Sequence, residues 1–291
     1  MSITKVAAIQ MNCSTDVNTN IEHAVSMVKE AAKNGANIIL LPELFERQYF
    51  CQERRYDYYK FALPTLENPA VKTFSKLAGE LNVVIPVSFY EKSGKQFFNS
   101  IAMIDNHGDI MGVYRKTHIP DDHYYQEKFY FTPGNTGFKV WKTEFGNVGV
   151  GICWDQWFPE AARCMVLDGA DILLYPTAIG SEPILDVDSS GHWKRTMQGH
   201  SAANITPVVA ANRYGLEEVL PCKENGNQSS ALTFYGNSFI TNETGEIIQC
   251  ASKDKDEILY AEFDFEKIEE ERSSWGLFRD RRPKQYLRIS E

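Results

Sequence analysis

Short apolar runs alternate with amphipathic segments along most of the chain. The apolar runs predict strands at residues 6–10, 38–41, 83–87, 171–175 and 208–211. In the segments between them, apolar side chains recur at helical spacing and predict helices at residues 18–33, 69–81, 159–167 and 191–204. Strands and helices that alternate in this way are typical of a single α/β architecture.

Hairpin signals interrupt this alternation. Turns rich in Asn, Asp and Gly join pairs of expected strands, 100–104 with 110–115, 138–143 with 148–152, and 238–241 with 247–250. A last strand is expected at 258–263. Because so many strands exceed what one open sheet holds comfortably, we expect two mixed sheets packed face to face, with helices outside. No linker divides the chain, which predicts one domain over residues 1–291.

The composition is that of an ordinary globular protein. Of the 291 residues, 43% are hydrophobic and 24% are charged, which is enough apolar surface for a substantial core. The formal net charge is -9 and no run of Lys or Arg stands out, so a nucleic-acid backbone is not expected as the main ligand. Such a charge mostly keeps a protein soluble, and it favours a cationic ligand only weakly.

The six cysteines show no pairing pattern. There is no CxxC pair and no His at zinc-site spacing, and a chain of this length does not need disulfide bonds, so reduced thiols and no bound metal are expected. The N-terminus has no basic segment followed by a long apolar stretch, and no apolar run approaches about 18 residues. We therefore expect a cytoplasmic protein without a membrane segment.

Cys153 is the first candidate for chemistry. It comes at the end of an expected strand of small and branched residues, and the helix expected from Pro159 follows within a few positions. A thiol at such a sharp turn is exposed at the sheet edge, and the backbone N–H groups just after it can point at an oxyanion. The competing interpretation is that Cys153 is a small buried hydrophobe, which is the usual fate of a free cysteine.

Two charged residues also follow expected strands directly. Glu43 comes after one strand and Lys116 after another, at the strand ends where α/β proteins collect their polar groups. Either residue alone is more often a solvated loop charge. Together they offer a thiol what it lacks, namely a base to take its proton and a cation to hold an oxyanion. A Cys–His pair is the rival arrangement, but no comparable turn accompanies the candidate histidines, His118, His123, His192 and His200.

The segments around these residues resemble a known family. Leu-Pro-Glu43, Tyr-Arg-Lys-Thr-His118 and Gly-Ile-Cys-Trp-Asp155 occur in the order of the Glu-Lys-Cys signature of the nitrilase superfamily. The resemblance runs from residue 7 to residue 262. It implies an α-β-β-α sandwich with mixed sheets, four-layered when dimerised, in a homo-oligomeric carbon-nitrogen hydrolase that has no metal and no organic cofactor.

The resemblance also implies roles for individual residues. Cys153 would be the nucleophile and Glu43 the base, while Lys116 and the backbone N–H of Trp154 would hold the oxyanion. The family carries a second glutamate, and residues 125–131 resemble the segment that contains it, so Glu127 is expected to orient Lys116 or the substrate amine.

The substrate is expected to be a small cationic ureido or amide compound. Relatives that hold a carboxylate place arginines after the nucleophile, whereas this chain has Asp155-Gln156-Trp157 there. Glu182 follows an expected strand that borders the pocket in this fold, so it can face a distal ammonium, with Asp121 adding negative charge. Tyr124 and Trp157 could line an alkyl chain or cover a cation. The sequence from Thr117-His-Ile-Pro-Asp121 to Gly134, together with Gly180-Ser-Glu-Pro183, resembles the branch of the family that hydrolyses N-carbamoylputrescine.

Other functions compete with this hypothesis. A carbamoylase or ω-amidase for an acidic substrate such as N-carbamoyl-β-alanine would need a basic pocket, which Arg213, Arg195 and Lys194 could supply. An idle binding or scaffold protein on the same fold has no physical reason to keep a base, a cation and a thiol together. Hydrolysis of a nitrile is less favoured, because no feature of the sequence is specific to it.

The C-terminal tail, from about residue 273 to 291, mixes aromatic and basic side chains. Trp275 and Phe278 lie among several arginines, and such a segment is hard to bury within its own chain. We expect it to pack on a neighbouring subunit. A patch for nucleic acid or membrane is the rival interpretation, which the shortness of the segment and the acidic whole chain disfavour.

Overall fold

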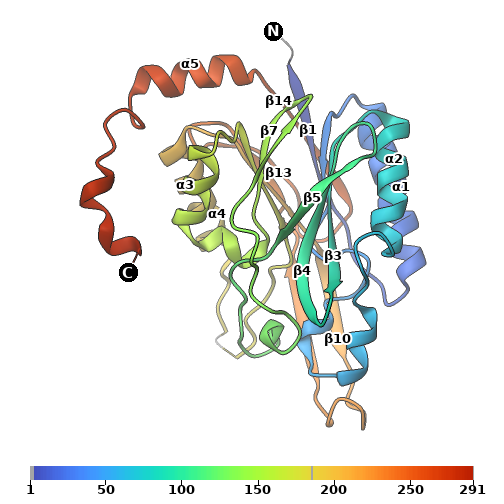
Figure 1. Cartoon of the computed structure of the whole chain (residues 1–291). Coiled ribbons are helices and arrows are strands. Elements are labelled where there is room, and N and C mark those ends of the chain that lie inside the picture. The colour runs from blue at the N-terminus through green and yellow to red at the C-terminus, as the bar shows by residue number, and fades with distance from the viewer. Residues whose placement is uncertain (1–2, 185, 291) are drawn as a thin grey trace.

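Two β-sheets pack face to face between two layers of helices (Figure 1). The computed structural model describes residues 3–184 and 186–290. Helices α1 (Val17–Lys33) and α2 (Pro69–Leu81) cover one sheet, and α3 (Pro159–Leu167) and α4 (Ser190–Asn204) cover the other. The predicted α-β-β-α sandwich is therefore confirmed. One chain supplies all four layers, so the layers themselves do not depend on pairing.

Each sheet mixes parallel and antiparallel neighbours. The first contains the order β14-β1-β2 and the order β3-β4-β5, with strands β14 (Glu257–Phe263), β1 (Thr4–Gln10), β2 (Ile38–Leu40), β3 (Ile85–Ser93), β4 (Gln96–Ile104) and β5 (Ile110–Arg115). A backbone bridge between Ile38 and Val84 joins these two halves. The second has the order β13-β12-β9-β8-β7-β6, with strands β13 (Ile247–Cys250), β12 (Phe239–Thr241), β9 (Val208–Asn212), β8 (Ile172–Thr177), β7 (Gly146–Val150) and β6 (Val140–Thr143).

The alternation of side chains along the strands builds the core. In β1, Val6 and Ala8 point into the layer between the two sheets, whereas Ala7 and Ile9 point toward α1 and α2. Both faces of the strand are buried, which explains why it reads as a continuous apolar run. The strands that border this layer also lead, at their ends, to the polar groups that the sequence singles out.

Several elements differ from the sequence-based prediction. Strand β3 starts later and extends to Ser93, forming a long hairpin with β4. A hairpin of β10 (Tyr214–Val219) and β11 (Ser230–Tyr235) was not predicted, because β10 is largely polar. Helix α5 (Phe265–Trp275) was also missed, since it buries only Ile268 and Arg272.

Short 3-10 turns fill the connections between the larger elements. They span Phe50–Gln52, Tyr56–Phe61, Glu127–Phe129, Cys153–Trp157, Pro283–Gln285 and Leu287–Ser290. Two of them, Glu127–Phe129 and Cys153–Trp157, contain residues that the sequence singles out for chemistry.

The described residues agree with two simpler expectations. All six cysteines are free, as expected of reduced thiols. Among the residues with described structure, no helix combines the length and the apolar character needed to cross a membrane.

Gly134 fixes the chain where β5 ends. Its backbone N–H donates to the carbonyl of Lys116 at 2.8 Å, which ties the loop after β5 to the segment around residue 134. A Cβ atom at Gly134 would lie 2.1 Å from the carbonyl oxygen of Arg115 and 2.7 Å from that of Lys116. Both neighbours are backbone atoms that cannot rotate away, so only glycine allows this approach.

We expect Gly134→Ala to lower the free energy of unfolding by about 1–3 kcal/mol, because the added methyl group overpacks a rigid backbone contact. Urea denaturation followed by circular dichroism measures the change. Gly199→Ala is the matched control, since Gly199 lies on the exposed side of α4 and a methyl group added there would have no neighbour within 4 Å. That helical substitution should stabilise by about 0.5–1 kcal/mol; a loss at both positions would contradict the steric explanation.

Candidate active site

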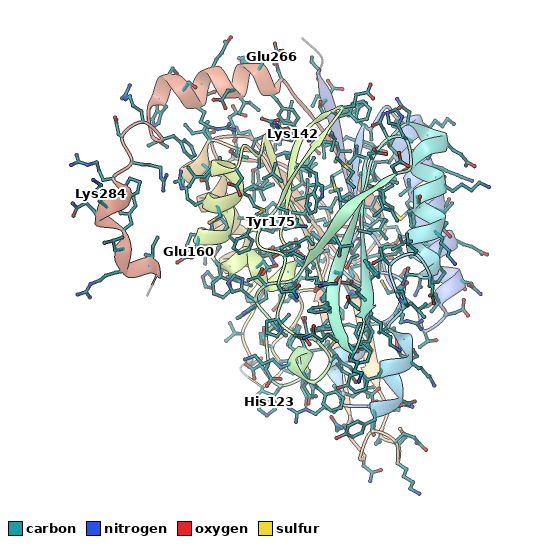
Figure 2. All side chains as sticks on the ribbon, in the orientation of Figure 1. His123, Lys142, Glu160, Tyr175, Glu266 and Lys284 are labelled. Carbon is teal, nitrogen blue, oxygen red and sulfur yellow. The ribbon has the colours of Figure 1, made fainter. Side chains whose placement is uncertain are left out.

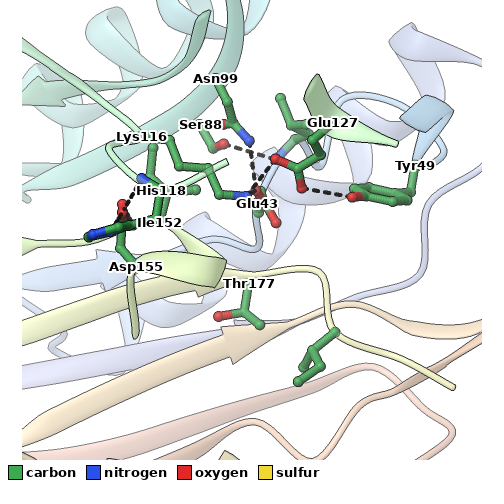
Figure 3. Close-up of polar contacts among 12 residues, drawn as sticks. Glu43, Tyr49, Ser88, Asn99, Lys116, His118, Glu127, Ile152, Asp155 and Thr177 are labelled. Atoms are coloured by element: carbon green, nitrogen blue, oxygen red, sulfur yellow. Dashed lines mark hydrogen bonds and ion pairs between the residues drawn. The ribbon is translucent and has the colours of Figure 1, made fainter. Parts of the chain in front are cut away.

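Glu43, Lys116 and Glu127 meet in one buried cluster (Figure 3), and the charges of all three act on the thiol of Cys153. Glu43 lies just beyond β2 and Lys116 just beyond β5, both in the first sheet. Cys153 follows β7 of the second sheet, and Glu127 begins a short 3-10 turn. Because the sheets pack face to face, strand ends of both sheets deliver their side chains to a shared region.

Lys116 lies between two buried carboxylates. Its Nζ is 2.9 Å from Oε1 of Glu43 and 2.7 Å from Oε2 of Glu127. All three side chains are essentially inaccessible to solvent. Burial alone would lower the pKa of Lys116, but the charges of Glu127 and Glu43 outweigh it and hold the pKa well above its usual value. The ammonium is therefore a fixed positive charge.

Glu43 has one engaged oxygen and one free oxygen. Its Oε1 accepts from Lys116 and from Nδ2 of Asn99, the latter at 2.7 Å. Its Oε2 is buried and has no hydrogen-bond partner among the residues that the structure describes. A buried acceptor without a partner is costly in a folded protein. That oxygen is available to accept a proton from a neighbouring group.

Glu127 is tied down at both oxygens. Oε2 accepts from Lys116, and Oε1 accepts from the hydroxyl of Tyr49 at 2.7 Å. Burial raises the pKa of Glu127 to about 7, although the charge of Lys116 opposes the shift. The two hydrogen bonds therefore hold this carboxyl group beside Lys116.

Cys153 sits on a strained turn. Its φ of 42° lies in the left-handed region, which a residue other than glycine rarely adopts. Burial and the charge of Glu43 raise the pKa of its thiol well above the usual value, while Lys116 and the backbone N–H of Ala178 act in the opposite direction. The resting thiol is protonated, so it needs a base before it can react.

Asp155 connects this turn to the loop that carries Lys116. Its Oδ2 accepts from the backbone N–H of Ile152 at 3.0 Å and from the hydroxyl of Tyr114 at 2.7 Å. Its Oδ1 accepts from the backbone N–H of His118 at 2.9 Å and lies 2.8 Å from Nδ1 of the same residue. The imidazole of His118, one of the four that the sequence offered as a rival base, is thus engaged by Asp155.

A cavity of about 380 Å³ opens onto Cys153. It is lined by Pro120, Asp121, Asp122, Tyr125, Glu127, Cys153, Trp154, Trp157, Ala178, Ile179, Glu182, Val187, Ser189 and His192. Carboxylates come from the loop at residues 121–127 and from Glu182, and no lysine or arginine is among the lining residues that the structure describes. Burial and the nearby charge of Asp122 raise the pKa of Glu182. The cavity is acidic and partly aromatic.

The structure brings most predicted substrate-binding residues to this cavity, but not all. Asp121, Trp157 and Glu182 line it. Tyr124 instead lines a neighbouring cavity of about 480 Å³, whose wall also includes His123, labelled at the lower end of the molecule in Figure 2. The adjacent Tyr125 takes the expected place, because a shift of one residue in this loop reverses the direction of the side chain.

The basic residues that an acidic substrate would need lie elsewhere. Arg213 is fully buried and faces Glu217. Lys194 donates to Oδ1 of Asn237 at 3.1 Å, and Arg195 lines a separate cavity beside α3. The structure therefore disfavours the hypothesis of an acidic substrate.

Three residues of the site had not been predicted. Tyr49 and Asn99 hold the two carboxylates, and the hydroxyl of Tyr125 accepts from the backbone N–H of Gly180 and donates to the carbonyl of Ser181. Asn99 offered a signal, because it is a polar residue in a strand whose neighbours are apolar. Tyr49 and Tyr125 offered none, since their partners are distant in the sequence.

Comparison with known proteins assigns the chain to a family. The model of the carbon-nitrogen hydrolase family matches residues 5–273, and the chain belongs to that family. It is 54% identical over 282 residues to an N-carbamoylputrescine amidase of Oryza sativa subsp. japonica, covering 97% of this chain and 92% of the relative. It is also 54% identical over 290 residues to a citrullinase of Francisella tularensis, covering 99% of each.

A solved structure supports the same assignment. The carbon-nitrogen hydrolase from Helicobacter pylori G27 superposes with a TM-score of 0.90 at 37% identity, covering 100% of this chain and 99% of that one. The predicted resemblance to the nitrilase superfamily is therefore confirmed, and the chain is an amidohydrolase rather than an idle scaffold.

The charges around Cys153 determine how the pKa of its thiol should respond to substitution of its neighbours. We expect Glu43→Gln to lower the pKa of the thiol, because a nearby negative charge that disfavours the thiolate is removed. Glu127→Gln should lower it less, and Lys116→Met should raise it. The pH dependence of alkylation by iodoacetamide, followed by intact mass, measures the shift. Cys153→Ala identifies the labelled site. If the pKa of the thiol changed equally in all three variants, the expected ranking of these charges would be ruled out.

Proposed function

We propose that the protein hydrolyses the ureido group of N-carbamoylputrescine, giving putrescine, ammonia and carbon dioxide. The observation that carries this proposal is the acidic cavity, which places carboxylates beyond a thiol that has a buried acid-base centre beside it. The similarity to N-carbamoylputrescine amidases over almost the whole chain supports the same substrate.

In the first half of the reaction, Glu43 takes the proton of Cys153 through its unpartnered oxygen. The thiolate adds to the ureido carbonyl. Lys116 and the backbone N–H of Trp154 hold the resulting oxyanion, since the first N–H groups of a helical turn have no partner within the turn. Glu43 then gives its proton to the departing ammonia, and a thiocarbamate remains on the sulfur.

In the second half, Glu43 takes a proton from water as the water attacks the thiocarbamate. The C–S bond breaks, the sulfur regains its proton, and the N-alkylcarbamic acid leaves and decomposes to putrescine and carbon dioxide. One carboxyl group thus alternates between base and acid, as is usual for covalent catalysis. Glu127 keeps Lys116 in place during both halves.

The distal ammonium is proposed to bind at Glu182. Asp121 and Asp122 add negative charge, and Trp157 supplies an apolar wall for the alkyl chain. An ammonium placed between these carboxylates also removes the repulsion that raises the pKa of Glu182.

Hydrolysis of citrulline is the second candidate, because the citrullinase relative is as similar as the amidases. Citrulline carries the same ureido group, but it has an α-carboxylate beside its ammonium. That carboxylate would need a cation or several N–H donors. The acidic lining of the cavity therefore favours the diamine derivative.

Ammonia release from a panel of four ureido compounds tests this proposal. We expect kcat/KM to be highest for N-carbamoylputrescine, lower for citrulline and N-butylurea, and lowest for N-carbamoyl-β-alanine. Glu182→Gln should reduce kcat/KM for N-carbamoylputrescine by roughly 10- to 100-fold, because a charge-assisted hydrogen bond contributes about 1.5–3 kcal/mol.

N-butylurea is the matched control, since it lacks only the ammonium. An equal loss on both compounds would remove Glu182 from specificity, and a higher rate on citrulline would favour the second candidate. Cys153→Ala should release no ammonia from any of the four.

We also propose that the C-terminal tail packs on a neighbouring copy of the chain. After α5 the tail passes outside α3, where Figure 2 shows Lys284 projecting from it. A cavity of about 810 Å³ lies between the tail and the α3 and α4 helices. Trp275 and Ile289 are each 69% exposed. Large exposed apolar side chains favour a partner surface, and Ile289 also lines this cavity. Glu291, the last residue of the tail, lies outside the described residues.

Deletion of residues 277–291 should lower the oligomer mass measured by light scattering after gel filtration. Ile289→Ser together with Trp275→Ser should weaken association in the same direction, because both changes remove apolar contact area. An unchanged mass for the deletion would contradict the proposed packing.

A further inference from the structure

Arg213 and Glu217 form a buried ion pair outside the cavity. Nη1 of Arg213 is 2.8 Å from Oε1 of Glu217, and the side chains are 0% and 2% exposed. The pair lies just after β9, at the start of the hairpin of β10 and β11. Burying two charges is costly unless their geometry is good and their remaining hydrogen-bonding groups are satisfied. The other contacts of the pair therefore indicate what it holds in place.

The guanidinium of Arg213 grips the backbone of the loop that follows β2. Nη2 donates to the carbonyl of Glu43 at 2.7 Å and to that of Leu44 at 3.1 Å. Nη1 donates to the carbonyl of Arg47 at 3.1 Å. Leu44 has a φ of 48°, a left-handed conformation that an L residue adopts only when its surroundings impose it. Arg213 thus holds the strained backbone next to Glu43.

Glu217 holds the other end of the same loop. Its Oε2 accepts from the backbone N–H of Tyr49 at 2.6 Å. The hydroxyl of Tyr49 in turn donates to Oε1 of Glu127 at 2.7 Å. The ion pair is therefore linked to the backbone of Glu43 through Arg213. It is linked to the carboxylate of Glu127 through Glu217 and Tyr49.

We propose that Arg213 and Glu217 are positioning residues that set the separation of Glu43 and Glu127 around Lys116. Neither residue lines the cavity, so neither touches substrate. The inference rests on the proposed roles of Glu43 and Glu127. It extends them by assigning the placement of both carboxylates to a single ion pair in the segment that leaves β9 and enters the β10–β11 hairpin. Reacting groups lose effectiveness when they are misplaced by about 1 Å, so this placement matters for rate.

Conservative variants separate positioning from simple stability. Arg213→Lys keeps the positive charge but cannot reach three carbonyl groups and a carboxylate at once. Glu217→Gln keeps the shape but has one acceptor oxygen instead of two, so it can serve Tyr49 or Arg213 but not both.

Arg272→Lys is the matched control. Arg272 is another buried arginine, and it donates to the carbonyl of Ile205 and to Oγ1 of Thr206, each at 3.1 Å. It does not contact the segment around Glu43.

The first measurement is steady-state hydrolysis of N-carbamoylputrescine at a temperature where every variant is folded. Arg213→Lys and Glu217→Gln should each lower kcat by roughly 10- to 100-fold and change KM by less than about threefold, because the groups that line the cavity are untouched. Arg272→Lys should lower the melting temperature and leave kcat unchanged. Equal loss of kcat in the three variants, or loss in proportion to unfolding, would overturn the proposal.

The second measurement does not depend on the substrate. The pH midpoint for alkylation of Cys153 by iodoacetamide should fall in Arg213→Lys and Glu217→Gln, because Glu43 and Glu127 move away from the thiol. It should stay in place in Arg272→Lys. Absence of turnover in the wild type, together with a shifted alkylation midpoint, would reject the proposed substrate and keep the positioning role. An unshifted midpoint would reject the positioning role itself.

Discussion

The buried ammonium of Lys116 between Glu43 and Glu127 is the interaction on which the site depends. Two carboxylates that share one ammonium away from solvent are stable only when hydrogen-bond donors compensate for the lost water. Asn99 donates to one oxygen of Glu43, and Tyr49 donates to one oxygen of Glu127. Among the described residues, Oε2 of Glu43 is left without a partner, and Glu43 is the group proposed to exchange a proton with the thiol.

The architecture supplies this arrangement through strand ends. Lys116 and Glu43 leave one sheet, Cys153 leaves the other, and the packing of the two sheets brings them together. Asp155 then links the turn at Cys153 to the loop after β5, so the segments that carry Cys153 and Lys116 are held together by one carboxylate. The strain at Cys153 is tolerated because these contacts over-determine its backbone.

Much of this could be predicted from local patterns. Glu43, Lys116 and Cys153 each follow an apolar strand directly, and a strand end has a predictable place in an α/β fold. Contacts between distant segments could not be predicted in this way. Tyr124 was expected in the cavity and Tyr125 lies there, because one residue of register decides which side chain faces inward. Arg213 looked available for a substrate carboxylate, but its partners come from residues 43–47, far away in the sequence. Polar elements such as β10 and α5 were missed because few of their side chains are buried.

The acidic lining of the cavity has a consequence for the end of the reaction cycle. The proposed substrate carries one positive charge at neutral pH, whereas the diamine formed from it carries two. Asp121, Asp122 and Glu182 therefore attract the product more strongly than the molecule from which it came. Departure of the diamine becomes the step most sensitive to ionic strength, because dissolved salt screens that attraction where the cavity meets solvent. The carboxylates proposed to select the substrate would thus make accumulated diamine an inhibitor of turnover.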